Sequence, residues 1–394
     1  MLSITPRTII AIFLTDSVMW GMWFGGLWSY RTAFASRITN SYTHIAISTA
    51  MPLIAASAIY MFFSIHGNFI KRYRVSLFKI AVVLSRIIYL ATSYIILTNL
   101  FNDIKLLYIT SIGFTIANTI GSIAGIAWAD YIADNIPIKF KSRYIALDST
   151  LGTLGALVGT FIAGLMLYEI HGIENYGRLF TTISIIFLID VPLLMFIKEL
   201  SKASIEYSEK PSRHYEEPIG RFYIAIVIIY LAINLTSSVI PPYIIYRFKG
   251  DEIWISMING VNWIAGLVTP ILWSIAVDYI GSLNTTKIAV TLAIVTNVVF
   301  PYMPSLYLQT IRAFLAGAAG VGIWITLISY LIKDVDISHR VNHIARVFTV
   351  QNLVPAIAMN LGGVLADALT VPEIVFMLPV IGFISLALLK ANRC

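Results

Sequence analysis

The chain has 394 residues, of which 58% are hydrophobic and only 12% are charged, and its mean hydropathy is +0.83. Soluble domains carry about 25% charged residues, so this composition excludes a water-soluble globular protein. The net charge of +7 does not indicate nucleic-acid binding, because the Lys and Arg residues fall in short segments between apolar runs. We therefore expect a multi-pass protein whose partner is the lipid bilayer.

Twelve apolar runs follow one another along the chain, each close to the roughly 20 residues that a helix needs to cross the hydrocarbon core. The first run is too long for a cleaved signal peptide and contains Asp16, so we interpret it as a permanent helix. The sequence predicts an all-α membrane protein with twelve transmembrane helices. The predicted spans are 8–30, 44–66, 76–98, 105–128, 145–168, 178–197, 221–246, 252–277, 286–303, 305–331, 347–368 and 372–390.

A polar stretch at 199–220 divides these spans six and six. We expect an N-terminal six-helix bundle at 1–198, a cytoplasmic linker at 199–220 and a C-terminal six-helix bundle at 221–394. A shift of 199 residues places the fourth span on the tenth with 7 identities in 25 positions. An internal duplication of this kind is typical of secondary transporters.

The distribution of Lys and Arg predicts the orientation in the membrane. With the N-terminus inside, 19 of the 27 basic residues fall in inner segments and 6 in outer segments. Cytoplasmic loops carry such an excess, so we expect a plasma-membrane protein with both termini in the cytoplasm. The only cysteine, Cys394, cannot form an internal disulfide, and the sequence offers no Cys/His metal motif. We predict no cofactor and no bound metal.

Three loops carry motifs. The loop after the second span reads GNFIKRYR (67–74), and the one after the eighth reads SIAVDYIG (274–281). Both resemble the G-x-x-x-D-R-x-G signature of the major facilitator superfamily, although the first has Lys for Asp and Arg for the final Gly, and the second lacks its first Gly and its Arg. The fourth span ends in WADYIADNIP (128–137), followed by KSR (141–143), which resembles a W-x-x-x-x-A-D-x-x-P-x-x-x-R-G-R loop of the same superfamily. The subfamily is not identified.

The resemblance implies two bundles that rock about a central site, with a gate on the cytoplasmic side. Arg72 and Arg74 are expected to pair with Asp130 or Asp134, and Asp278 with the N-terminus of a neighbouring helix, where the dipole favours a carboxylate. The alternative is that these are ordinary solvated loop charges. The candidate gate comprises Gly67, Arg72, Arg74, Asp130, Asp134, Arg143, Asp278 and Gly281.

Ionisable side chains inside membrane spans are costly and often functional. Asp16, Arg86 and Asp190 lie in three different spans, all roughly 12–15 Å from the inner boundary at 1.5 Å per residue. We therefore predict a buried charge cluster in which a carboxylate, with Asp16 the best candidate, binds and releases a transported proton. The alternative is a static ion pair that stabilises the bundle.

Further polar and aromatic residues are candidates for a substrate cavity. Trp20, Trp23 and Phe24 follow Asp16 in the first span, which lines the cavity in the superfamily, but helix packing or an interfacial belt would explain them too. Asn259 and Asn262 share a face of the eighth span, and Asn118 lies midway along the fourth. Arg312 is expected either to face the cavity or to reach the outer headgroups. The candidate cavity residues are Trp20, Trp23, Phe24, Asn118, Asn259, Asn262 and Arg312.

Together these features favour a secondary active transporter that moves a small organic solute by alternating access, with protons as the coupling ion and the monomer as the working unit. The alternative is a multidrug or amphiphile exporter of the same fold. A polytopic membrane enzyme is less favoured, because the sequence lacks a large polar loop with clustered catalytic acids or histidines. No G-x-x-x-x-G-K-[ST] loop for ATP is present. We predict no catalytic residue and no enzymatic activity.

Overall fold

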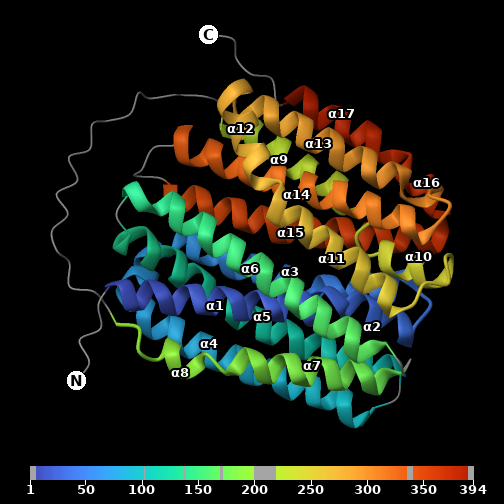
Figure 1. Cartoon of the computed structure of the whole chain (residues 1–394), viewed down its shortest axis with the longest axis horizontal. Coiled ribbons are helices and arrows are strands. Elements are labelled where there is room, and N and C mark those ends of the chain that lie inside the picture. Colours follow the sequence, from blue (N-terminus) through green and yellow to red (C-terminus); the bar gives the residue numbers. More distant parts are fainter. Residues whose placement is uncertain are drawn as a thin grey trace.

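The computed structural model describes residues 6–388 apart from 102, 137, 169–171, 199–218 and 335–339. Every regular element in this part of the chain is a helix (Figure 1). The first half contains α1 (Pro6–Gly26), η1 (Trp28–Tyr30), α2 (Arg31–Ile38), α3 (Tyr42–Ile65), α4 (Gly67–Thr98), α5 (Asp103–Asn135), α6 (Ile138–Leu167), α7 (Ile173–Leu188) and α8 (Val191–Leu194). The second half contains α9 (Ile219–Asn234), α10 (Ile240–Tyr246), α11 (Glu252–Val268), α12 (Pro270–Ile280), α13 (Ser282–Val299), η2 (Phe300–Tyr302), α14 (Leu306–Asp334), α15 (Arg340–Ala368), α16 (Val371–Val375) and α17 (Met377–Leu388).

The two halves lie side by side, with α1 to α8 in one group and α9 to α17 in the other (Figure 1). Two helix pairs make the broadest contact between them, α3 with α15 and α6 with α11. The N-terminal end of α1 and the C-terminal end of α17 lie at one end of the molecule. The short helices α2, α10 and α16 lie at the opposite end, which we call the α2 end (Figure 1). Most of the expected linker, and Cys394, lie outside the described residues.

Ten helices among the described residues are long and apolar enough to cross a membrane, and an eleventh span forms if α11 and α12, which bend by 46° at their junction, are counted together. The expected seventh span, 221–246, is divided into α9 and α10. Pro241 and Pro242 stand in the first turn of α10. Proline lacks the N–H that would continue a preceding helix and is tolerated in a first turn, so the chain starts a new helix here.

The first span is longer than the sequence predicted. It continues past Tyr30 through α2 and reaches Ile38, whereas Arg31 and Arg37 were expected in an outer loop. Arg31 is only 5% exposed. The short apolar and small residues after it extend the helix, so this arginine is carried into the protein interior and does not face the solvent.

Glycines set the distance between α1 and α6. A Cβ atom on Gly155 would overlap the backbone oxygen of Val18, and one on Gly159 would overlap that of Met22. Membrane helices approach closely where such small residues face each other. The spaced glycines of the fifth span thus bring α6 against α1, the helix that carries Asp16.

Candidate functional site

The three charged residues predicted to form a cluster come together between α1, α4 and the α7–α8 junction. The Arg86 guanidinium donates hydrogen bonds to the carboxylates of Asp16 and Asp190 and, over 2.8 Å, to the backbone oxygen of Phe187. Its charge also lies 4.0 Å from the centre of the Phe187 ring. We call Asp16, Arg86 and Asp190 the charge cluster.

The two acids of the charge cluster differ in exposure. The side chains of Arg86 and Asp190 are 3% and 2% exposed, while that of Asp16 is 19% exposed. Two carboxylates around one guanidinium leave one negative charge in a region where charge is costly. Asp16 is therefore the member of the cluster that water can reach.

A fourth charged residue, Asp148 of α6, lies next to the charge cluster. Its carboxylate accepts hydrogen bonds from the hydroxyl of Ser17 and, over 3.5 Å, from that of Tyr144. It is close enough to Asp16 for the two negative charges to interact. The sequence pattern did not single out Asp148, because it stands near the start of its span, just after basic loop residues. The sequence feature that could have identified Asp148 is its position as a carboxylate inside an otherwise apolar run.

The aromatic residues of α1 divide into two groups. Trp20 contacts Phe24, with ring centres 5.2 Å apart, and Phe24 contacts Trp263 of the second half at 5.6 Å. Trp263 donates a 3.2 Å hydrogen bond to the Thr160 hydroxyl. Trp20, Phe24 and Trp263 thus form an aromatic chain across the interface between the halves.

Trp23 turns toward the interior of the first half, although its ring centre also lies 6.4 Å from that of Trp20 and 6.3 Å from that of Phe24. It is 4% exposed and packs against Tyr89 and Phe187, with ring centres at 4.8 and 5.5 Å, inside the first half. Successive helical residues are separated by about 100°, so Trp23 and its neighbour Phe24 cannot point the same way.

The candidate amides make contacts within their own halves. Asn118 donates a 2.9 Å hydrogen bond to the Pro52 backbone oxygen, and Asn262 donates over 3.4 Å to that of Ala313. Asn259 is partly exposed on α11.

Arg312 is buried within the second half of the protein. It is 4% exposed, donates a 2.8 Å hydrogen bond to the Gln309 side chain and lies 5.0 Å from the Phe300 ring centre.

The candidate gate residues are spread over several helices. Arg74 donates a 3.1 Å hydrogen bond to the Asp130 carboxylate, and both side chains are 6% exposed. This pair joins α4 to α5 within the first half, so it does not itself connect the halves. Arg72 is exposed and lies 5.3 Å from the Tyr73 ring centre. The surroundings of Gly67, Asp134 and Arg143 lie outside the described residues.

The second copy of the loop motif stands at the junction of α12 and α13. Gly281 has a φ of +80° there, a conformation that glycine adopts without the steric cost of a Cβ. Asp278 is exposed in the last turn of α12. The glycine of the motif is thus explained by backbone geometry.

Polar contacts between the halves gather at the α2 end. Arg37 donates a 2.8 Å hydrogen bond to the Glu252 carboxylate, which also accepts one of 3.1 Å from the Tyr176 hydroxyl. The Tyr246 hydroxyl lies 2.8 and 2.9 Å from the backbone oxygens of Ser36 and Thr39. The sequence pattern singled out none of these residues, because each stands where a span meets its loop.

Asp367 of α15 adds a further contact at this end. Its carboxylate accepts hydrogen bonds from the Ser41 hydroxyl at 2.8 Å and from the backbone N–H groups of Tyr42 and Thr43, both at 2.9 Å. A carboxylate at the first turn of α3 satisfies N–H groups that have no partner within the helix. We call the contacts of Arg37, Tyr246 and Asp367 with their partners across the interface the α2-end latch.

Comparisons with known proteins show which solved structures resemble this one. No family model matches the sequence, and no curated protein matches it. Among solved structures, the xylose transporter XylE from E. coli in a partially occluded inward-open conformation has a TM-score of 0.71 and 15% identity, over 98% of this chain and 97% of that one. The nucleoside transporter NupG has a TM-score of 0.67 and 14% identity, over 98% of this chain and 99% of that one. A bacterial homologue of the human lysosomal transporter Spinster has a TM-score of 0.64 and 11% identity, over 98% and 99% of the two chains.

These likenesses extend over almost the whole of each chain, and they agree with the two helical halves and with the loop motifs. At identities this low they establish the fold. The protein therefore has the multi-pass membrane fold of the major facilitator superfamily.

Proposed function

We propose that this protein is a secondary active transporter that moves a small polar organic solute across the membrane by alternating access. The observation that carries the proposal is the charge cluster with Asp148 beside it, because ionisable side chains inside membrane spans commonly mark substrate and proton pathways. The solved structures that resemble it support the proposal, because they include a D-xylose–proton symporter and a nucleoside transporter.

We propose protons as the coupling ion and Asp16 as the residue that carries them. Asp16 is the more exposed acid of the charge cluster, and Asp148 adds a second negative charge nearby. Binding a proton at Asp16 removes this repulsion and leaves Arg86 paired with Asp190 alone. Release of the proton restores the bond to Arg86, so protonation changes the contact between α1 and α4.

The α2-end latch closes one end of the protein, and the orientation in the membrane determines whether that end is the inner or the outer one. With both termini in the cytoplasm, the α2 end is the outer end, and the latch is a closed outer gate. This conformation is then inward-facing, in keeping with the inward-open conformations of two similar XylE structures. The aromatic chain of Trp20, Phe24 and Trp263 lies between the latch and Asp16, where a ring-shaped solute would stack.

The test has two stages. A thermal-shift screen of the purified protein against sugars, nucleosides and other small solutes identifies ligands, since a ligand that binds the native state raises its stability. Proteoliposomes then measure accumulation of that solute under an imposed pH gradient. We expect Asp16→Asn to abolish accumulation while exchange of labelled for unlabelled solute persists, because the amide resembles the protonated acid.

The matched control is Asp103→Asn, the same chemical change at an exposed position at the start of α5, which should transport normally. Accumulation driven by the pH gradient in Asp16→Asn would refute the coupling role. Lipophilic dyes as the sole stabilising ligands would instead favour the exporter of the same fold.

A further inference from the structure

Arg31 is a buried cation for which the described residues provide no counter-charge. It is 5% exposed and lies about 10 Å from the end of the first span at Ile38, at 1.5 Å per residue. One of its nitrogens, Nη2, donates a hydrogen bond to the backbone oxygen of Thr49. Its guanidinium carbon lies 3.8 Å from the centre of the Trp28 ring. No described carboxylate forms an ion pair with it.

The other two nitrogens of this guanidinium are unsatisfied. Nε and Nη1 of Arg31 are both buried and have no hydrogen-bond partner among the described residues. A buried donor without a partner is destabilising, and more so when it is charged. A carbonyl and a ring face only partly compensate a full positive charge in this region, so a further ligand is expected beside the guanidinium.

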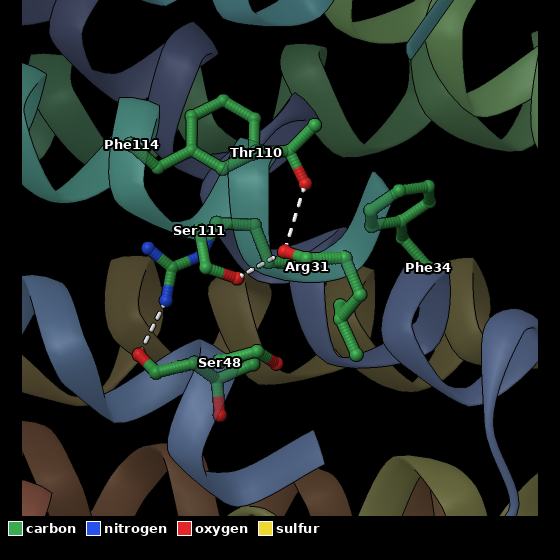
Figure 2. Close-up of a pocket in the computed structure, with 8 residues that line it drawn as sticks. Arg31, Phe34, Ser48, Thr110, Ser111 and Phe114 are labelled. Carbon is green, nitrogen blue, oxygen red and sulfur yellow. Dashed lines mark hydrogen bonds between the residues drawn. The ribbon is translucent and has the colours of Figure 1, made fainter. Parts of the chain in front are cut away.

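The guanidinium faces a small pocket between α2, α3 and α5. Figure 2 shows it between Ser48 and Ser111, with Thr110 and Phe114 also lining the space. The cavity volume is about 10 Å³. Pockets for organic ligands measure roughly 300–1,000 Å³, so this one is too small for such a solute. A cavity of about this size holds one small particle, so the ligand is a single small ion or molecule.

The hydroxyl groups of the pocket can turn toward an anion at small cost. Ser111 now donates a 2.6 Å hydrogen bond to the Leu107 backbone oxygen, and Thr110 donates one of 2.8 Å to that of Leu106. Carbonyls inside a helix also accept the backbone N–H four residues on, so they stay paired if a hydroxyl rotates away. The pocket therefore offers the guanidinium N–H groups of Arg31 and the O–H group of Ser111 to a single ligand, with Thr110 also lining the space.

We propose that this pocket binds a chloride ion, held by Nε and Nη1 of Arg31 and by the hydroxyl of Ser111. Chloride supplies the missing negative charge, which a water molecule would not. The site adjoins a contact between the halves, because the neighbouring Tyr30 shares a hydrogen bond with Ser256 of α11. The ion thus stabilises the segment of the first span that meets the second half.

The test measures the thermal stability of the whole purified protein at constant sodium concentration, with chloride replaced stepwise by the much larger gluconate. We expect the apparent Tm to rise with chloride concentration as binding linkage requires, and this dependence to disappear in Arg31→Gln. The matched control, Arg178→Gln, removes an exposed arginine of α7 and should keep the full dependence.

A second variant covers the case in which Arg31→Gln does not fold. Ser111→Val fills the pocket and removes a donor while keeping the arginine, and it should weaken the chloride dependence severalfold. Crystals grown in bromide should show an anomalous peak beside Arg31. Equal Tm values for the wild type in chloride and gluconate, meaning that water fills the pocket, would overturn the proposal. So would an unchanged chloride dependence in Arg31→Gln or in Ser111→Val.

Discussion

Arg37 of α2 and Glu252 of α11 form an ion pair of 2.8 Å that joins the two halves of the protein at the α2 end. The two side chains are 29% and 2% exposed, and the buried carboxylate accepts hydrogen bonds from this arginine and from Tyr176. The alternating access proposed above requires such contacts to break when this end opens. The pair is therefore a candidate for setting the balance between the two conformations.

Glu252→Gln should shift that balance toward the state open at the α2 end. Replacing one charged partner of a partly exposed pair costs roughly 1–2 kcal/mol, which corresponds to about a tenfold change in population. The measurement is maleimide labelling of an Ala46→Cys reporter in a Cys394→Ser background, because Ala46 is buried against Gly363 across the interface. Labelling should be about tenfold faster in the Glu252→Gln protein.

The control for this experiment is Asp251→Asn, which removes the adjacent charge but keeps a residue able to cap α11 through its hydrogen bond from the Trp254 N–H. It should label at the parental rate. Equal labelling of the parental and Glu252→Gln proteins would show that the pair does not hold this end closed.

Arg86→Ala should destabilise the protein by roughly 3–5 kcal/mol, because it leaves Asp16 and Asp190 as buried carboxylates without a counter-charge. Unfolding in detergent measures the effect. The double variant Arg86→Ala/Asp190→Asn should recover part of the loss, since it removes the more deeply buried acid. Arg178→Ala, at an exposed position, should behave as the wild type. A stability of Arg86→Ala within about 1 kcal/mol of the wild type would contradict the structural importance of the cluster.

Gly155→Ala should lower the apparent Tm, because the added methyl group meets the backbone of α1 and the two helices must move apart. Overpacking of this kind costs roughly 1–3 kcal/mol. Gly320→Ala is the matched control, since a Cβ there has no neighbour within 4 Å and alanine is the better helix former by about 1 kcal/mol. A Gly155→Ala protein as stable as Gly320→Ala would mean that α1 and α6 do not pack this closely.

The orientation of the chain can be tested with its single thiol, Cys394. The charge asymmetry of the loops predicts a cytoplasmic C-terminus. A membrane-impermeant maleimide should therefore leave Cys394 unlabelled in intact cells and label it after permeabilisation. Ready labelling in intact cells would reverse the topology, and with it the assignment of the α2-end latch to the outer side.

The sequence predicted more of the charge cluster than of the latch. Asp16, Arg86 and Asp190 stand out because each is a charge inside an apolar run, and equal depth follows from counting residues along a helix. Arg37, Glu252 and Asp367 lie near span ends, where charges are common, so nothing in the sequence distinguished them. Arg31 was assigned to a loop for the same reason, although the helix continues beyond it.

The sequence by itself determined that this is a helical membrane protein, roughly where its spans run and which spans carry charge, because hydropathy and helical spacing are local properties. Only the tertiary structure decided that Trp23 turns into the first half while Phe24 meets Trp263, that Asp148 lies beside Asp16, and that Asp367 caps a helix more than 300 residues away in the sequence. These contacts join helices that are distant along the chain. They depend on the rotation and distance of each helix relative to its neighbours, which are set by close packing such as that of Gly155 on α1.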